Sequence, residues 1–341
     1  MNIFRYSCPF LLLMTFPAML AGQEQLPRQQ TVTINPNAAL FPVHDPVMIK
    51  QDSVFYLFAT GGGSAFSTEM KNWKRGPRVF EKTPEWITQD MIPGFRGGGY
   101  WAPDIHYANG KYYLYYAFSA FGKNTSVIGV ATNTTLNPQN PDFKWTDHGL
   151  VIQSVPNRDF WNAIDPNLII DGDQGWLAFG SFWGGIKLVK LSPDLFSVAK
   201  PEVWYTIARR PRSFPLQDDD PGDGPVEAPF IYRHGDYFYL FISVDYCCRG
   251  VNSNYKVLVG RSLKVEGPYV DRDGKSLAVG GGTIIAQGNE YWAGVGHSAH
   301  YDFDGVSYMI MHGYDKLDNG RSKLIIREMK WDSEGWPSID L

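Results

Sequence analysis

The chain has 341 residues, of which 19% are charged and 15% aromatic, and its formal net charge is -4 at pH 7. This length allows one large domain or two ordinary ones, and the composition excludes a disordered chain. No segment concentrates enough basic residues to neutralise the phosphates of a nucleic acid, so we expect no nucleic-acid partner.

The first 22 residues are typical of a secretory signal peptide. Arg5 supplies the positive charge, an apolar stretch follows as far as Leu20, and the small residues Ala21 and Gly22 precede a polar segment. The apolar stretch is too short to span a membrane, and no Cys stands at the expected cleavage point for lipid attachment. We therefore expect an exported protein, periplasmic or extracellular, without a membrane anchor; a buried N-terminal element is the alternative.

Five later segments share one pattern, in which a polar residue opens a short strand, a polar turn follows and an aromatic-rich strand returns. Strand, short turn and strand is the signature of a β-hairpin. Another short apolar strand follows several of the hairpins, for example at residues 127–131 and 257–260. The five segments cover residues 44–58, 102–115, 164–179, 227–241 and 296–311.

The polar residues that open the five segments are Asp45, Asp104, Asp165, Glu227 and His297. They recur roughly every 60 to 70 residues, which leaves room for about four strands per repeat. Four-stranded units repeated around an axis make a β-propeller. The sequence therefore predicts an all-β protein with one five-bladed β-propeller domain over residues 31–341, without a linker.

Equivalent positions on the innermost strands of a propeller face a common axis, so we expect these polar residues to surround one cavity. A hydrophobic core does not tolerate several unpaired carboxylates. Such a cluster suits either a cation or acid–base chemistry on an acetal, which needs one protonated carboxylic acid and one ionised carboxylate. In this interpretation Glu227 donates a proton to the leaving oxygen and Asp45 activates water. Capping of turns by the individual Asp residues is the alternative.

Aromatic residues close to these positions offer flat surfaces on which sugars stack, although most aromatic residues in β proteins belong to the core. They include Trp101, Phe121, Trp161, Phe182 and Trp183.

Four motifs in order resemble those of the family-43 glycoside hydrolases, and among them the endo-acting α-1,5-L-arabinanases. The resemblance extends from about Leu40 to the C-terminus. The motifs are His44-Asp45-Pro46, Trp101-Ala102-Pro103-Asp104, Ala163-Ile164-Asp165-Pro166-Asn167 and Glu227-Ala228-Pro229.

The resemblance implies an inverting hydrolase of arabinan with Asp45 as general base and Glu227 as general acid. Asp165 would tune the pKa of Glu227 and help to position it. His297 would lie beside a central cation, usually calcium, that is partly coordinated through water. The substrate-binding residues implied are His44, Trp101, Asp104, Phe121, Asn162 and Ser181.

The resemblance leaves the mode of cutting open. An insert over residues 84–99 is expected at the rim of the cleft, where it could block one end and favour exo action, so an exo-acting arabinan hydrolase or α-L-arabinofuranosidase is the first alternative. A β-xylosidase, a fructan-acting retaining hydrolase and a non-catalytic carbohydrate-binding propeller are further alternatives. We expect a monomer.

Cysteine residues give little further information. Cys8 lies in the predicted signal peptide, and Cys247 and Cys248 are adjacent. They could form a vicinal disulfide in an oxidising compartment or remain two thiols, and one dipeptide does not suffice for a metal site.

Overall fold

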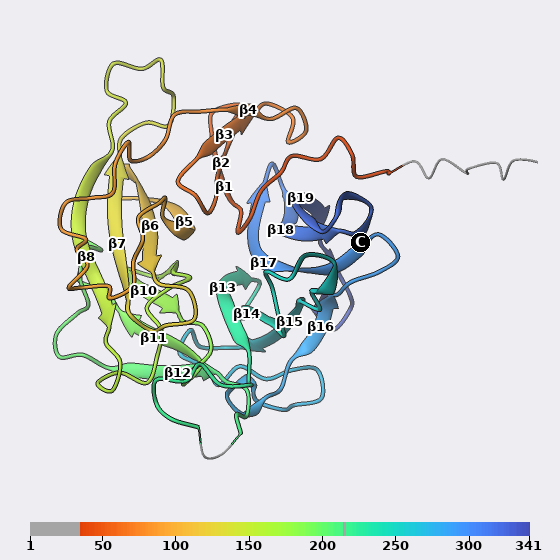
Figure 1. Ribbon diagram of the computed structural model, residues 1–341. Helices are drawn as coiled ribbons and strands as arrows, with labels where there is room; N and C mark the ends of the chain where they lie inside the picture. Colours follow the sequence, from red (N-terminus) through yellow and green to blue (C-terminus); the bar gives the residue numbers. More distant parts are fainter. Residues whose placement is uncertain (1–34, 214–215) are drawn as a thin grey trace, which may run out of the picture. The chain divides into compact units, whose positions relative to one another are not determined.

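The computed structural model describes residues 35–213 and 216–341, and these residues form antiparallel β-sheets with only three single-turn 3-10 helices (Figure 1). Residues 35–341 make one compact unit. The predicted signal peptide lies outside the described residues. None of the helices in the described part of the chain has the length and hydropathy to cross a bilayer.

The sheets follow one another along the chain, and each is built from consecutive antiparallel strands. Blade 1 contains β1 (Val47–Gln51), β2 (Val54–Phe58), β3 (Ser64–Ser67) and β4 (Lys74–Arg75). Blade 2 contains β5 (Trp101–Ala108), β6 (Lys111–Ser119), β7 (Ser126–Asn133) and β8 (Thr146–Ser154). Blade 3 contains β9 (Asn167–Asp171), β10 (Gln174–Phe179), β11 (Ile186–Lys190) and β12 (Trp204–Ala208).

Blade 4 contains β13 (Val226–His234), β14 (Tyr237–Val244), β15 (Lys256–Ser262) and β16 (Thr283–Ala286). Blade 5 contains β17 (Trp292–Phe303), β18 (Val306–Asp315) and β19 (Arg321–Glu328). The helices are η1 (Gly250–Asn252), η2 (Leu277–Val279) and η3 (Lys316–Asp318), and β20 (Lys330–Trp331) pairs with β21 (Pro337–Ser338) near the C-terminus.

The first strands of the blades form a ring. Each contacts the first strand of the next blade, in the order β1, β5, β9, β13 and β17, and β17 contacts β1 again. The N-terminal segment closes this ring, because the Phe41 carbonyl accepts from Leu324 N at 2.8 Å and Val43 N donates to the Ser322 carbonyl. Residues 41–43 thus supply blade 5 with its outer partner, and the predicted five-bladed propeller is confirmed.

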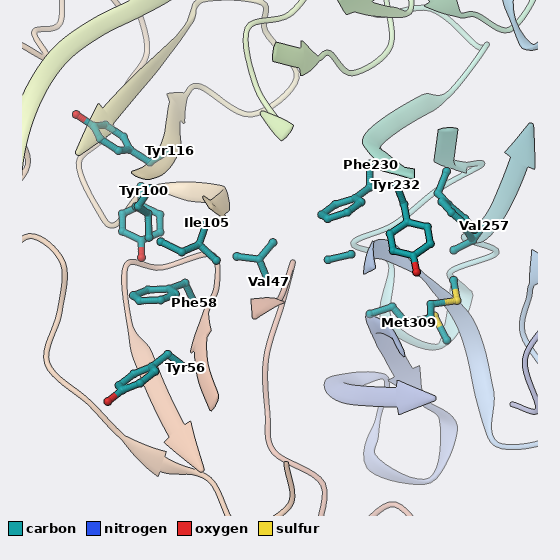
Figure 2. Packing of buried hydrophobic residues seen from close by; sticks show 14 of the residues in the cluster. Val47, Tyr56, Phe58, Tyr100, Ile105, Tyr116, Phe230, Tyr232, Val257 and Met309 are labelled. Carbon is teal, nitrogen blue, oxygen red and sulfur yellow. The ribbon is translucent and has the colours of Figure 1, made fainter. Parts of the chain in front are cut away.

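Apolar side chains fill the spaces between adjacent blades. Figure 2 shows Val47 and Phe58 of blade 1 near Tyr100, Ile105 and Tyr116 at blade 2. It also shows a second group between blades 4 and 5, made of Phe230, Tyr232, Val257 and Met309. Removing these large side chains from water is the main force that holds the blades together.

Each blade has one residue with a positive φ, just before or near the start of the inner strand in blades 1 to 4 and within β17 in blade 5, and in four blades Pro follows it. This left-handed conformation is easiest for Gly and is also adopted by Asp and Asn, and Pro is tolerated because the ladder is interrupted there. The ladder shifts register at this point in blades 2, 4 and 5. The equivalent residues are Asp45, Ala102, Asp165, Ala228 and His297.

This equivalence corrects the register predicted from the sequence. Asp45, Asp165 and His297 are equivalent as expected, but Glu227 precedes the equivalent residue of blade 4, and Asp104 follows that of blade 2 by two positions. Strand side chains alternate in direction, so such offsets change what a side chain faces. Glu227 still reaches the cavity described below, whereas Asp104 does not.

Candidate active site

A cavity of about 490 Å³ lies where the inner strands begin. Its walls combine carboxylates, imidazoles, aromatic rings and the Cys247–Cys248 pair. The residues predicted for the site that line it are His44, Asp45, Trp101, Phe121, Asn162, Asp165, Ser181, Glu227 and His297. The three carboxylates Asp45, Asp165 and Glu227 are all less than 10% exposed.

Asp45 is surrounded by hydrogen-bond donors. His44 Nδ1 lies 2.8 Å and Thr60 Oγ1 2.6 Å from its Oδ2, and His297 Nδ1 lies 3.0 Å from its Oδ1. Burial alone would raise the pKa of Asp45, but the charges and hydrogen bonds of His44 and His297 outweigh it and hold this pKa well below the usual value. Asp45 is therefore ionised at neutral pH, as a general base must be.

Glu227 lies at the start of β13 and has a different environment. Burial is the largest influence and raises its pKa, and the nearby Asp45 raises it further. The hydrogen bond from Ser181, the nearby Tyr255 hydroxyl and the charge of His297 act in the opposite direction. Ser181 Oγ donates to Glu227 Oε2 at 2.8 Å. A raised pKa keeps a carboxyl group protonated closer to neutral pH, as a general acid requires.

Asp165 is linked to Glu227 through the backbone. Its Oδ2 accepts a hydrogen bond at 3.0 Å from the N–H of Ala228, the residue that follows Glu227. Burial raises the pKa of Asp165 to about 7, with the His297 charge opposing and the Glu227 and Asp45 carboxylates adding to the shift. Asp165 therefore fixes the strand that carries Glu227 and shares the negative charge of the cavity with it.

His297 and His312 both approach Asp45 but differ in state. Burial lowers the pKa of His312 well below its usual value, and its Nδ1 accepts from Asp45 N at 3.1 Å, which requires a neutral ring. The pKa of His297 is raised to about 9: burial lowers it, but Asp45, Asp165 and Glu227 together outweigh burial. His297 thus contributes positive charge among the three carboxylates.

The arrangement at His297 is compatible with a cation. A metal-binding histidine commonly donates its second ring N–H to a carboxylate, and here Nδ1 of His297 contacts Asp45. Nε2 of His297 makes no side-chain hydrogen bond within the described residues, so after release of its proton it could ligate a cation that takes its other ligands from water. A separate group, His44, Asp45 and His312, also brings three ligand atoms within 4.8 Å of one another.

The predicted sugar-contacting residues lie on the wall provided by blades 2 and 3. The Trp101 and Phe121 rings are 6.5 Å apart and inclined at 61°, and Phe121 is 81% exposed. Asn162 is fixed by Ser126, whose Oγ donates to Asn162 Oδ1 at 2.6 Å. An exposed ring of this size at a cavity mouth provides a stacking surface.

Asp104, which was predicted to bind substrate, lies away from the cavity. Its carboxylate does not line the cavity; Oδ2 accepts hydrogen bonds from Leu168 N at 2.7 Å and Asn167 Nδ2 at 3.4 Å. Asp104 therefore joins blade 2 to blade 3. Burial raises its pKa to about 7 despite these hydrogen bonds.

The insert over residues 84–99 also differs from expectation, because none of its residues lines the cavity. It packs outside blade 2, where Thr125 Oγ1 donates to the Pro93 carbonyl at 3.2 Å and the Phe95 ring meets Phe118 edge-on. Ile92 is fully buried there. The insert therefore supports the base of the loop that carries Phe121.

Several residues of the site were not recognised from the sequence. Thr60 donates to Asp45 and accepts from Ala102 N at 2.7 Å, so it joins blades 1 and 2 beside the carboxylate. Tyr314 Oη lies 2.8 Å from His44 Nε2. Thr60 follows β2 and Tyr314 lies in β18, which are the second strands of their hairpins. The sequence pattern assigns such strands to the core. The only sequence signal for these two residues is a polar group in or next to an apolar strand.

The cavity thus contains three carboxyl groups and has an aromatic rim. Asp45 is ionised, Glu227 has a raised pKa, and Asp165 holds the strand that carries Glu227. Such an arrangement can activate water on one side of an acetal and protonate the leaving oxygen on the other.

Known proteins are similar to this chain in sequence and in fold. The family model described as "Glycosyl hydrolases family 43" matches residues 35–337. The extracellular exo-α-(1→5)-L-arabinofuranosidase ArbA of Cellvibrio japonicus is 49% identical over 87% of this chain and 86% of its own length. The extracellular endo-α-(1→5)-L-arabinanase 1 of Bacillus subtilis is 43% identical over 87% of each chain.

A solved structure has a similar fold. The α-L-arabinanase of Cellvibrio cellulosa in complex with arabinohexaose matches 88% of this chain and 96% of its own, with 48% identity and a TM-score of 0.86.

Proposed function

Because the chain belongs to the family-43 glycosyl hydrolases, whose enzymes invert, we propose that it hydrolyses internal α-1,5-L-arabinofuranosidic bonds of arabinan. The observation that carries this proposal is the pairing, in one cavity, of a carboxylate whose pKa is held well below its usual value and a carboxyl group whose pKa is raised. The relatives named as arabinanases and the arabinohexaose complex support the substrate class.

In the mechanism that we propose, Asp45 removes a proton from water as that water attacks the anomeric carbon. Glu227 gives its proton to the departing oxygen in the same step, which inverts the configuration. Asp165 holds the Glu227 segment through Ala228 N, while burial and the nearby Asp45 carboxylate raise the pKa of Glu227 and favour the protonated acid. Trp101, Phe121 and Asn162 hold the sugars, and His44 orients Asp45 through a 2.8 Å contact.

We propose that a cation, calcium by the family resemblance, binds at Nε2 of His297 and completes its shell with water. The support is the contact of Nδ1 with Asp45 and the presence of three carboxyl groups around this ring, of which Asp45 is ionised. Bound there, the cation would stabilise the clustered carboxylates of the folded protein.

Exo action is the second candidate, favoured by the 49% identity to the relative named as an exo-arabinofuranosidase. The position of residues 84–99 outside the cavity supports endo action. We further propose that the protein is exported and that it is a monomer. Export is supported by the two named relatives, which are described as extracellular, and by the signal-peptide pattern of residues 1–22.

Product analysis on linear arabinan tests the proposed function. Endo action gives oligosaccharides of mixed length early in the reaction, together with a rapid fall in polymer size. Release of arabinose or of one short product from the start would assign exo action. No hydrolysis of linear or branched arabinan would contradict the assignment to this substrate.

A further inference from the structure

The loop between β14 and β15 forms part of the cavity wall. Tyr246, Cys247, Cys248 and Arg249 all line the cavity that holds the carboxylates. Cys247 and Cys248 form a disulfide between adjacent residues. Cys248 is exposed and Cys247 half-buried, so the sulfur atoms are open to what enters the cavity.

The disulfide is connected to Asp45 through two side chains. Cys248 N donates to Tyr314 Oη at 2.8 Å, and Cys248 Sγ lies 3.9 Å from both Tyr314 Oη and His44 Nε2. His44 in turn contacts Tyr314 Oη through Nε2 and Asp45 through Nδ1, each at 2.8 Å. The wall at the disulfide is therefore continuous with the environment of the proposed base.

A contribution to global stability does not explain this disulfide. A disulfide stabilises a fold mainly by shortening the unfolded chain between its two cysteines, and adjacent cysteines enclose almost no chain. The loop has its own supports, since Ser253 Oγ donates to the Tyr246 carbonyl at 2.8 Å and Tyr246 N donates to Asn254 Oδ1 at 2.9 Å. The Arg249 guanidinium also stacks 3.8 Å from the centre of the Tyr246 ring.

We propose that the Cys247–Cys248 disulfide is a substrate-contacting wall of a sugar subsite next to Asp45, and that its reduction weakens binding of arabino-oligosaccharides. The inference rests on the proposed function for the identity of the sugar. A disulfide presents a polarisable, largely apolar surface without a hydrogen-bond donor, which suits the C–H face of a furanose ring. Two thiols would introduce weak donors and separate sulfur atoms with independent rotation beside His44.

Dithiothreitol provides the reduction that tests this proposal. Its thiolate attacks one sulfur and the S–S bond breaks; the dithiol supplies two electrons and becomes a cyclic disulfide, while two protons end on Cys247 and Cys248. Alkylation and mass spectrometry of the peptide that contains both cysteines reports the state of this pair alone, separately from Cys8. The peptide should resist alkylation before reduction and take two alkyl groups afterwards.

Kinetics and calorimetric binding with an arabino-oligosaccharide are then compared between the oxidised and reduced protein. We expect KM and Kd to rise about fivefold to tenfold, which corresponds to the loss of roughly one favourable sugar contact, while kcat changes less than about twofold. Reoxidation should restore both constants. The double variant Cys247→Ser/Cys248→Ser should show the weaker binding of the reduced protein and no response to dithiothreitol.

Unchanged KM and Kd after complete reduction would overturn the proposal, as would a peptide that is alkylated without any reductant. A fall in Tm that tracks the loss of binding would assign the disulfide to stability instead. If the oxidised protein binds the oligosaccharide but does not hydrolyse it, the proposed function is contradicted and the inference about the disulfide is not. The comparison of Kd between the oxidised and reduced protein still tests whether the disulfide contacts the sugar.

Discussion

At the scale of single residues, Asp45 and Glu227 differ because of the groups around them and not because of their depth. Both are almost fully buried, and burial raises the pKa of each. Two imidazoles reverse the effect at Asp45, whereas the donors at Glu227 only reduce it. One cavity thus holds a proton donor and a proton acceptor at the same pH.

Replacement of Ser181 by Ala should move the alkaline limit of activity. Ser181 Oγ donates to Glu227 at 2.8 Å and thereby lowers the pKa of this acid, so its loss should raise that pKa further. Activity that needs protonated Glu227 would then persist to higher pH. The measurement is the pH profile of kcat for wild type and Ser181→Ala. An alkaline limit that stays in place or moves to lower pH would contradict the assignment of this limit to Glu227.

Removal of divalent cations should lower Tm or activity if His297 holds a cation. The physical reason is that three carboxylates around one imidazole repel one another less beside a cation. Chelation followed by calorimetry tests this, with His297→Gln as the matched variant whose Tm should not respond to chelator. The same Tm and activity with and without chelator in the wild-type protein would remove the cation from the site.

The sequence predicted the carboxyl groups and the histidine of the site, but not the residues that form hydrogen bonds with them. Asp45, Asp165, Glu227 and His297 lie in one cavity because each stands at or next to the positive-φ residue of its blade. Thr60 and Tyr314 were not predicted because they contact the site from outside the inner strands. Contacts between strands far apart in sequence depend on blade packing, which no local pattern specifies.

At the scale of elements, the interrupted start of each inner strand decides which side chains face the cavity. The sequence predicted five repeats but aligned them on their acidic residues, whereas the structure aligns them on backbone conformation. Ala102 occupies the position of Asp45 and Asp165, so Asp104 is two residues too far along its strand. An offset of one or two residues in a bulged strand is not visible in a pattern of residue types.

Asp104 has a structural role that can be measured through the pH dependence of stability. Its pKa is raised to about 7 by burial, so the folded state binds a proton that the unfolded state has already released between about pH 4 and pH 7. The free energy of unfolding should therefore fall as pH rises through this window, by at most about 1.4 kcal/mol per pH unit.

The variant Asp104→Asn keeps an acceptor for Leu168 N and has no carboxyl group to titrate. Relative to wild type, its stability should improve steadily between pH 4 and pH 7, as measured by urea unfolding at several pH values. A difference between the two proteins that is independent of pH would show that Asp104 does not titrate in this range.

At the scale of the whole molecule, closure of the ring depends on a polar cluster that holds the N-terminal segment to blade 5. Lys323 Nζ is 2.8 Å from Asp315 Oδ2 and donates to the Asn37 carbonyl at 3.2 Å. Asn35 Nδ2 also donates to Asp315, at 2.9 Å. Asp315 and Lys323 are almost completely buried, so each needs the other as a partner.

Replacement of Lys323 by Met should lower the free energy of unfolding by about 2–3 kcal/mol, because a buried carboxylate loses its charged partner. Lys330→Met is the matched control, since Lys330 pairs with Asp340 at an exposed position and should change stability little. Denaturant unfolding compares the variants. Equal effects of the two substitutions would argue against a special role of this cluster in ring closure.

The propeller itself was predictable because its signal is repeated five times. Short strands, polar turns and aromatic returns recur with enough regularity that errors in single repeats do not change the fold. The closing contact of residues 41–43 with β19 was not predicted, since it joins the two ends of the domain and leaves no local mark on the sequence.

The division of labour between Asp45 and Glu227 is tested most directly by the dependence of the Glu227→Ala variant on its leaving group. General acid catalysis typically contributes about 10²–10⁴-fold, and an activated aryl arabinofuranoside needs little of it. We expect kcat/KM on arabino-oligosaccharides to fall by about that factor while turnover of the aryl substrate is largely spared; Asp45→Ala should impair both. Equal losses on both substrates in Glu227→Ala would contradict the assignment of Glu227 as the proton donor.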